Sequence, residues 1–135
     1  MPSTVVSFGT FDLFHVGHLR LLERASHFGD RLVVGVSSDA LNVSKKGYRP
    51  VFPEGDRLHI VSSLGIVDGV FLEESLEDKA EYLVEQQADV MVMGDDWEGR
   101  FDHLAEIVKV VYLPRTDGIS TSELKRVLAT GPSEL

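Results

Sequence analysis

The chain has 135 residues, of which 43% are hydrophobic and 26% are charged, and it contains no cysteine. This length fits one domain with one core, and the composition excludes a wholly disordered chain. The missing cysteines exclude disulfide scaffolds and thiolate sites, and the formal net charge of −9 excludes the overall basic surface of a nucleic-acid-binding domain.

The first residues carry neither the basic stretch nor the apolar run of a secretion signal. The apolar runs are far shorter than the roughly 20 residues needed to span a bilayer. We therefore expect a cytoplasmic protein with no membrane insertion.

Short apolar runs typical of strands alternate with helical patterns along the chain. In chain order, we expect a strand at 5–8, a helix at 19–28, a strand at 32–36, a long polar loop at 39–55, a helix at 58–64, a strand at 69–72, a helix at 76–84, strands at 90–93 and 108–113, and a helix at 120–128.

This alternation predicts right-handed crossovers between parallel strands. The expected fold class is α/β, with a doubly wound, Rossmann-like, mostly parallel five-stranded sheet. One domain is expected over residues 1–130, with residues 131–135 as a C-terminal tail. Ligands of such sheets bind at the carboxyl ends of the strands near the switch point, so the segments after the first, second, fourth and fifth strands are the places to look.

The segment after the first strand places His15 and His18 beside Gly17 at the start of a helix. Imidazoles and free backbone N–H groups in this position suit an anion such as a phosphate. The alternative is that the two histidines only cap the helix. The spacing alone supports both interpretations equally. A metal site is disfavoured because the sequence shows no third ligand at a suitable spacing.

The segment after the second strand carries a basic cluster, Lys45, Lys46 and Arg49, in an acidic protein. A solvated face and a loop that closes over a polyanion are both open interpretations. Arg57 follows in the first turn of the next helix, where a cation opposes the helix dipole. It is therefore expected to have an anionic partner.

The segments after the last two strands are also unusual for plain loops. The single tryptophan, Trp97, stands beside three acidic residues, although it could simply cover the edge of the core. After the fifth strand, Ser120 and Glu123 have the spacing of a capping box, and Arg115 beside this helix start favours phosphate binding. Basic groups at one edge of an acidic protein favour a small polyanionic substrate.

Three stretches together resemble the cytidylyltransferase family. Residues 9–18 (GTFDLFHVGH) resemble its phosphate-binding motif, and residues 115–121 (RTDGIST) resemble its second motif. Residues 93–102 (MGDDWEGRFD) are similar to the small bacterial members that act on glycerol 3-phosphate. The resemblance extends over residues 4–128, and the three motifs in this order are more specific than the His-x-Gly-His shared with adenylyl-transferring relatives.

The resemblance implies a reaction between CTP and a phosphorylated alcohol, expected to be sn-glycerol 3-phosphate, that gives CDP-glycerol and pyrophosphate. It also implies Mg²⁺ as the cofactor and a homodimer. The ligands of the metal are left unknown, with Asp12 and Asp39 as weaker candidates that would lie near either the acceptor or the metal. Three alternatives stay open: another phospho-alcohol or amino-alcohol phosphate as acceptor, an adenylyltransferase, and a CTP-binding module without turnover.

The resemblance also implies a role for each matching residue. Catalytic roles fall on His15, His18, Lys45, Lys46 and Arg115. Nucleotide binding is expected from Gly9, Thr10, Phe11, Gly17, Gly94, Asp95, Trp97, Arg115, Thr116, Ile119, Ser120 and Thr121. Acceptor binding is expected from Asp12, Asp39 and Arg57.

Two positions depart from the pattern of the members that act on glycerol 3-phosphate. Gly65 stands where these members usually carry an arginine, and Leu76 stands where they tend to carry a tryptophan. Both positions are associated with the acceptor side or the surroundings of the site. The nucleotide half therefore matches better than the acceptor half.

Overall fold

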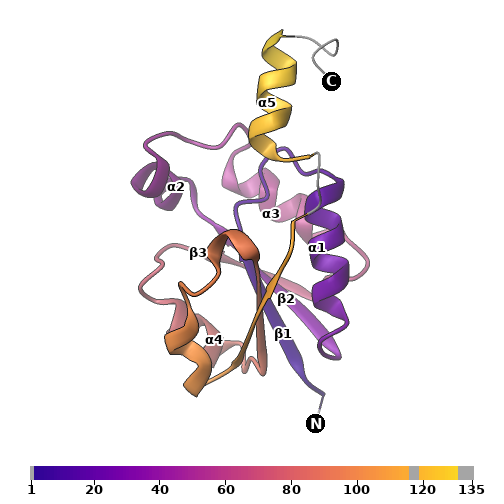
Figure 1. Ribbon diagram of the computed structural model, residues 1–135, viewed down its shortest axis with the longest axis vertical. Coiled ribbons are helices and arrows are strands. Elements are labelled where there is room, and N and C mark those ends of the chain that lie inside the picture. The colour runs from indigo at the N-terminus through magenta and orange to yellow at the C-terminus, as the bar shows by residue number, and fades with distance from the viewer. Residues whose placement is uncertain (1, 116–118, 131–135) are drawn as a thin grey trace.

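The computed structural model of the protein describes residues 2–115 and 119–130 and shows a five-stranded parallel sheet between helices (Figure 1). The elements in chain order are β1 (Thr4–Gly9), α1 (Val16–Ser26), β2 (Arg31–Ser37), α2 (Asp39–Lys46), α3 (Glu54–Ser62), β3 (Gly69–Glu73), α4 (Lys79–Glu85), β4 (Val90–Gly94), the 3₁₀ turns η1 (Asp95–Trp97) and η2 (Asp102–Glu106), β5 (Lys109–Leu113) and α5 (Thr121–Thr130).

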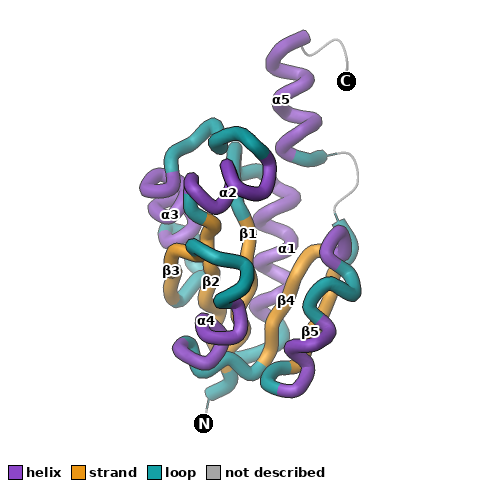
Figure 2. Tube along the Cα trace, turned by 90° about the vertical axis from the view of Figure 1, so that its left-hand side faces the viewer, coloured by secondary structure: helices purple, strands orange, loops and turns teal. Residues whose placement is uncertain are grey.

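The strands are ordered β3-β2-β1-β4-β5, which confirms the doubly wound sheet predicted from the sequence. The order reverses between β1 and β4, where Val5 to Ser7 pair with Val90 to Val92. Loops that follow these two strands leave the sheet in opposite directions and open a crevice at its carboxyl edge. Figure 2 shows β1 and β4 side by side, with α1 and α4 in different layers.

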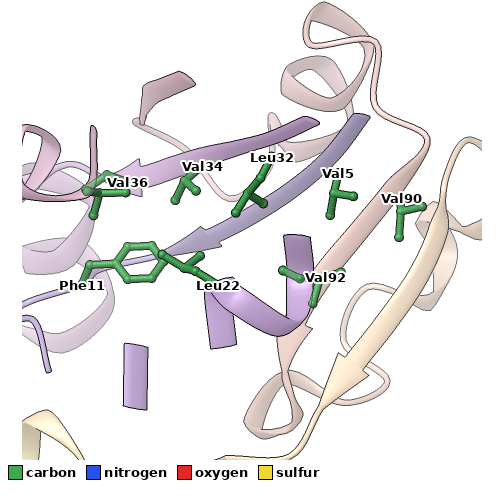
Figure 3. Packing of buried hydrophobic residues seen from close by; sticks show 10 residues of the cluster. Val5, Phe11, Leu22, Leu32, Val34, Val36, Val90 and Val92 are labelled. Atoms are coloured by element: carbon green, nitrogen blue, oxygen red, sulfur yellow. The ribbon is translucent and has the colours of Figure 1, made fainter. Parts of the chain in front are cut away.

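The two faces of the sheet carry separate apolar layers because neighbouring strand residues point to opposite sides. Val5 and Val34 belong to one cluster together with Leu22 of α1 (Figure 3). Val61 of α3 is a member of the same cluster. Val6 and Val33 belong to the other, with Leu83 of α4 and Leu104 of η2. Strands that are apolar on both faces are thereby covered on both faces.

Residues 39–55 were predicted to form one long loop, and this prediction is wrong for the first half of the segment. α2 occupies Asp39–Lys46, and the side chain of its N-cap Ser38 accepts a hydrogen bond from the Leu41 backbone N–H at 3.0 Å. The helix buries Asn42 beside Leu41, so its inward face is partly polar. A polar buried face leaves no apolar periodicity for sequence analysis to detect.

α5 projects past the carboxyl edge of the sheet, away from both apolar layers (Figures 1 and 2). None of its residues is buried. Within residues 2–115 and 119–130, no helix has both the length and the apolar character needed to cross a membrane. The expected tail at 131–135 lies outside the described residues.

Candidate active site

A cavity of about 370 Å³ opens at the carboxyl edge of the sheet. Its walls come from the loop after β1, from α2, from the β3–α4 connection, from the segment after β4 and from the start of α5. This volume is within the range of small-molecule sites. The strand order therefore gathers segments that are far apart in the sequence around one space.

Most of the predicted site residues lie in this wall. The cavity is lined by Gly9, Thr10, Phe11, Asp12, His15, Gly17, His18, Lys45, Lys46, Gly94, Trp97, Arg115, Ile119, Ser120 and Thr121. Asp39, Arg57 and Asp95 are not part of the lining. Thr116 lies outside the described residues.

His15 and His18 are held by hydrogen bonds to the backbone at the start of α1. His15 is the N-cap, and its Nδ1 accepts from the Gly17 N–H at 3.0 Å. The Nδ1 of His18 accepts in turn from the His15 N–H at 3.1 Å, and the two rings stack with centroids 3.8 Å apart. An Nδ1 that accepts a hydrogen bond carries no proton, so each neutral ring bears its proton on Nε2.

The capping and anion-binding interpretations of these histidines are compatible, because the two ring nitrogens have different tasks. The Nδ1 atoms complete the helix start, whereas the buried Nε2 of His15 has no partner among the described residues. A Cβ on Gly17 would lie 2.8 Å from Cε1 of His15, so only glycine lets this ring fold over the helix start. The geometry leaves Nε2–H donors for a ligand.

Both histidine rings are neutral at pH 7. Burial and the neighbouring His15 lower the pKa of His18 to about 3, and burial also lowers the pKa of His15. The rings therefore donate hydrogen bonds rather than carry fixed positive charge. Cationic groups at this site come from other residues.

Lys45 and Lys46 supply positive charge from the last turn of α2. Lys45 is half-buried, and its Nζ lies 5.8 Å from the centre of the Trp97 ring across the cavity. Burial lowers the pKa of Lys45. The basic cluster is thus part of the cavity wall, at least through its two lysines.

After β4, the cavity is lined by Asp96 and not by its predicted neighbour Asp95. Asp96 Oδ1 lies 2.8 Å from the point that a Cβ on Gly94 would occupy. The absence of a side chain at Gly94 therefore leaves the room that this carboxylate needs. Trp97 lines the cavity and also packs against the second apolar cluster, with its ring 5.4 Å from that of Phe101. Trp97 therefore both contributes to the cavity wall and covers the edge of the core.

The start of α5 is anchored to the loop after β1. Ser120 Oγ accepts from the Glu123 N–H at 3.0 Å, which confirms the predicted cap, while the Glu123 carboxylate pairs with Arg126. Thr121 Oγ1 donates to the carbonyl oxygen of Asp12 at 2.9 Å. These contacts bring a helix N-terminus, with its free N–H groups, to the cavity.

Asp39 and Arg57 form an internal ion pair of 2.7 Å outside the cavity lining, so the anionic partner expected for Arg57 is confirmed. The fully buried guanidinium also donates to carbonyl oxygens of Thr10, Ser37 and Phe52. Its donors are directed at the protein itself, and the predicted contact with the acceptor has no support in this geometry.

Asp12 lines the cavity, but its carboxylate also fastens the segment after α2. Its two oxygens accept from the backbone N–H groups of Val51 at 2.7 Å and Phe52 at 2.9 Å. Lys125 of α5 lies 3.9 Å from the same carboxylate. Asp12 therefore joins three segments of the cavity wall.

Sequence reasoning missed a buried ion pair in the wall, between Glu73 at the end of β3 and Lys79 at the start of α4. Lys79 Nζ lies 2.5 Å from Glu73 Oε2, and both residues line the cavity. A glutamate at the carboxyl end of the expected third strand was a usable signal, because that strand ends at the same edge as the others.

No group of three or more His, Asp or Glu side chains suited to a metal ion occurs in the described part of the chain. The carboxylates of Asp12 and Glu73 are already engaged by N–H donors and by Lys79, respectively. Mg²⁺ in nucleotide sites keeps several waters and binds mainly substrate phosphates. These side chains fit a Mg²⁺ ion that is bound chiefly by the phosphates of the nucleotide, with few or no protein ligands.

A model of the cytidylyltransferase-like family matches residues 6–127. The chain is 46% identical over 125 residues to the glycerol-3-phosphate cytidylyltransferase of Bacillus subtilis (strain 168), which covers 93% of this chain and 96% of the relative. It is 41% identical over 126 residues to the enzyme of that name from Staphylococcus aureus (strain NCTC 8325 / PS 47), covering 92% and 93%.

A solved structure, the lipopolysaccharide core biosynthesis protein from Thermoplasma volcanium GSS1, is similar with a TM-score of 0.76. It is 29% identical in sequence and covers 87% of this chain and 100% of its own. Fold, motifs and relatives agree over nearly the whole sequence. The chain belongs to the cytidylyltransferase-like family.

Proposed function

We propose that the protein transfers CMP from CTP to sn-glycerol 3-phosphate, forming CDP-glycerol and releasing pyrophosphate. The observation that carries this proposal is the single cavity in which the histidine segment, the segment after β4 and the start of α5 meet. The two relatives named above support the same acceptor, because their names specify glycerol 3-phosphate and their identity extends along the whole domain.

In the proposed reaction, an oxygen of the acceptor phosphate forms a bond to the α-phosphorus of CTP. The bond from the α-phosphorus to the bridging oxygen breaks, and pyrophosphate leaves with that electron pair. The protein positions the two phosphates and stabilises the charge that develops between them. Nε2–H groups of His15 and His18 are placed to donate to the triphosphate, and Lys45 and Lys46 to neutralise the reacting phosphates.

The start of α5 suits the β- and γ-phosphates. Ser120 and Thr121 line the cavity at a helix N-terminus, where free N–H groups and the helix dipole favour anions. Arg115 lines the same wall. These groups would hold the leaving pyrophosphate, while Asp96 and Trp97 would lie beside the cytidine.

We also propose that Mg²⁺ enters as a complex with CTP, where it would neutralise part of the triphosphate charge. A cytoplasmic location and a homodimer complete the proposal. For a chain of 14.9 kDa, analytical ultracentrifugation distinguishes a monomer from a dimer directly.

The test is pyrophosphate release by purified protein with Mg²⁺, CTP and a panel of phosphorylated alcohols. The panel contains glycerol 3-phosphate, phosphocholine and phosphoethanolamine, and ATP replaces CTP as the control nucleotide. Release with CTP and glycerol 3-phosphate supports the proposal. Release with another acceptor only, or with ATP only, would contradict it and identify the true substrates.

A further inference from the structure

Asn42 is a buried amide in the cavity wall that the contacts proposed above do not use. It is 1% exposed and, with Leu41, is one of the two buried residues of α2. The residue lines the cavity together with Thr10 of the loop after β1. An amide in this place either contacts the substrate or holds the wall around it, and its hydrogen bonds decide between these two tasks.

The hydrogen bonds of Asn42 form a closed ring with two hydroxyl groups. Thr10 Oγ1 donates to Asn42 Oδ1 at 2.9 Å, and Asn42 Nδ2 donates to Ser37 Oγ at 3.0 Å. The ring closes between the Ser37 and Thr10 hydroxyl oxygens, which lie 3.1 Å apart, with Ser37 as the donor because the Thr10 proton is already used. Nδ2 also donates to the Ser38 carbonyl oxygen at 2.9 Å. The polar atoms of the amide therefore bind the protein itself.

This ring places α2, the helix that carries Lys45. Thr10 follows β1 and Ser37 ends β2, so the amide fastens α2 to the carboxyl ends of two paired strands. Lys45 lies three residues after Asn42, which puts both on one face of the helix. Both residues line the cavity, and Lys45 Nζ lies 5.8 Å from the centre of the Trp97 ring. The position of this ammonium group thus depends on how Asn42 is held.

We propose that Asn42 is a positioning residue, which fixes the Lys45 ammonium beside the reacting phosphates without contacting the substrate itself. α2 has only eight residues, and a helix of this length does not hold its own shape and place in water. Hydrogen bonds of defined direction fix the rotation of such a helix, whereas apolar contacts alone tolerate slippage. The task of Lys45 is part of the proposed function, so this inference rests on that proposal.

The experiment is a double-mutant cycle on kcat for pyrophosphate release from CTP with glycerol 3-phosphate. Asn42→Leu removes the ring at a similar volume, and Lys45→Met removes the ammonium at a similar length. We expect Asn42→Leu to lower kcat at least about tenfold, because a misplacement of about 1 Å at a reacting centre costs roughly 10²-fold. In the Lys45→Met background, the same substitution is expected to lower kcat by less than about twofold, since its effect passes through Lys45.

The cycle separates positioning from a general structural role. Damage to the fold would lower kcat by the same factor whether or not Lys45 is present. An equal loss from Asn42→Leu in both backgrounds therefore overturns the proposal, as does an unchanged kcat when Lys45 is present.

Two serine variants keep the test usable if Asn42→Leu does not fold. Ser37 and Ser7 are fully buried in the paired strands β2 and β1, and Ser7 Oγ donates to the Val92 carbonyl oxygen at 2.7 Å, outside the cavity lining. Ser37→Ala opens the ring and is expected to lower kcat about threefold when Lys45 is present, as one of its hydrogen bonds is lost. Ser7→Ala is the matched control and is expected to leave kcat unchanged. Equal effects of the two variants overturn the proposal.

Trp97 tests the placement of Lys45 without turnover, because it is the only tryptophan of the chain. Displacement of the Lys45 ammonium opens the ring to acrylamide, so we expect Asn42→Leu and Lys45→Met to raise the quenching constant of the fluorescence by similar factors. Quenching in Asn42→Leu equal to that of the wild type overturns the proposal. Wild-type protein that releases no pyrophosphate with glycerol 3-phosphate overturns the proposed function instead, while the quenching still decides whether Asn42 places Lys45.

Discussion

The imidazoles at the start of α1 combine a structural and a chemical task in one side chain. Each Nδ1 accepts a backbone hydrogen bond, and protonation of Nδ1 would remove that bond. The rings are therefore suited to act as neutral donors through Nε2. Stabilisation of developing charge by such fixed donors is worth more in the transition state than in the bound ground state.

We expect His18→Ala to lower turnover by roughly 10²-fold or more, while the affinity for CTP falls much less. Steady-state kinetics gives the turnover and calorimetry gives the affinity. Equal losses in both quantities would show that His18 only holds the substrate.

The lowered pKa of His18 also makes stability depend on pH. The folded-state value of about 3 lies below the ordinary 6.5, so the unfolded chain binds more protons between these two values. The contribution of the neutral ring is complete above pH 6.5 and is lost as the pH falls toward 3. Urea unfolding at pH 7.5 and 5 is expected to show a smaller loss of stability in His18→Gln than in wild type, and identical losses would contradict the assignment.

Residues whose role is local could be predicted from the sequence, and residues whose role depends on a distant partner could not. His15 and His18 act within one helix start, so their spacing was informative. Asp96 replaces Asp95 in the cavity wall because the turn of η1 decides which of the two adjacent acids faces inward. No spacing rule orients a 3₁₀ turn in advance.

At the scale of elements, single tyrosine hydroxyls fasten two of the connections that form the cavity. Tyr112 of β5 accepts from the Phe101 N–H at 3.0 Å and donates to Asp102 at 3.0 Å, which holds the segment after β4. Tyr82 of α4 accepts from the Glu74 N–H at 3.0 Å, which holds the β3–α4 connection. Neither side chain lines the cavity.

We therefore expect Tyr112→Phe to raise the KM for CTP about fivefold with little change in kcat, because the two hydrogen bonds that it removes are together worth about 1 kcal/mol of positioning. Steady-state kinetics with varied CTP provides the check. Tyr82→Phe is the matched control and is expected to leave this KM unchanged. A fall in kcat alone for Tyr112→Phe would contradict a positioning role.

The elements themselves were predictable to different degrees. The five strands were found from their apolar runs, and the first helix from its periodicity, because these segments bury apolar side chains. α2 was missed because its buried face includes Asn42, whose amide donates to Ser37 and Ser38 carbonyl oxygens and whose Oδ1 accepts from Thr10. A helix stabilised by such a polar network has a sequence that looks like a loop.

At the scale of the whole molecule, Arg57 joins the ends of β1 and β2 to α2 and to the segment before α3. Its guanidinium binds the carbonyl oxygens of Thr10 after β1, Ser37 at the end of β2 and Phe52 before α3, besides the carboxylate of Asp39 in α2. The sequence indicated an anionic partner for Arg57. The carbonyl acceptors of Thr10 and Ser37 depend on the strand order and had no signal in the sequence.

We expect Arg57→Met to lower the free energy of unfolding by about 3 kcal/mol or more, because buried acceptors and Asp39 lose their donor. Urea denaturation measures this loss. Arg57→Lys is expected to restore little of it, since an ammonium lacks the planar fork that reaches separate acceptors. Full stability in the lysine variant would show that charge alone accounts for the role of Arg57.

α5 differs from the other helices because none of its residues is buried, and Leu128 is 76% exposed. A helix of ten residues with no buried side chain is marginal in water, so its amides should exchange with deuterium sooner than those of α1 in the free protein. Bound CTP should slow this exchange, which mass spectrometry of the two peptides would detect. If CTP does slow this exchange, opening of α5 weakens by linkage the binding of the phosphates proposed to lie at its start, and the product departs through local unfolding of α5 while the sheet stays folded.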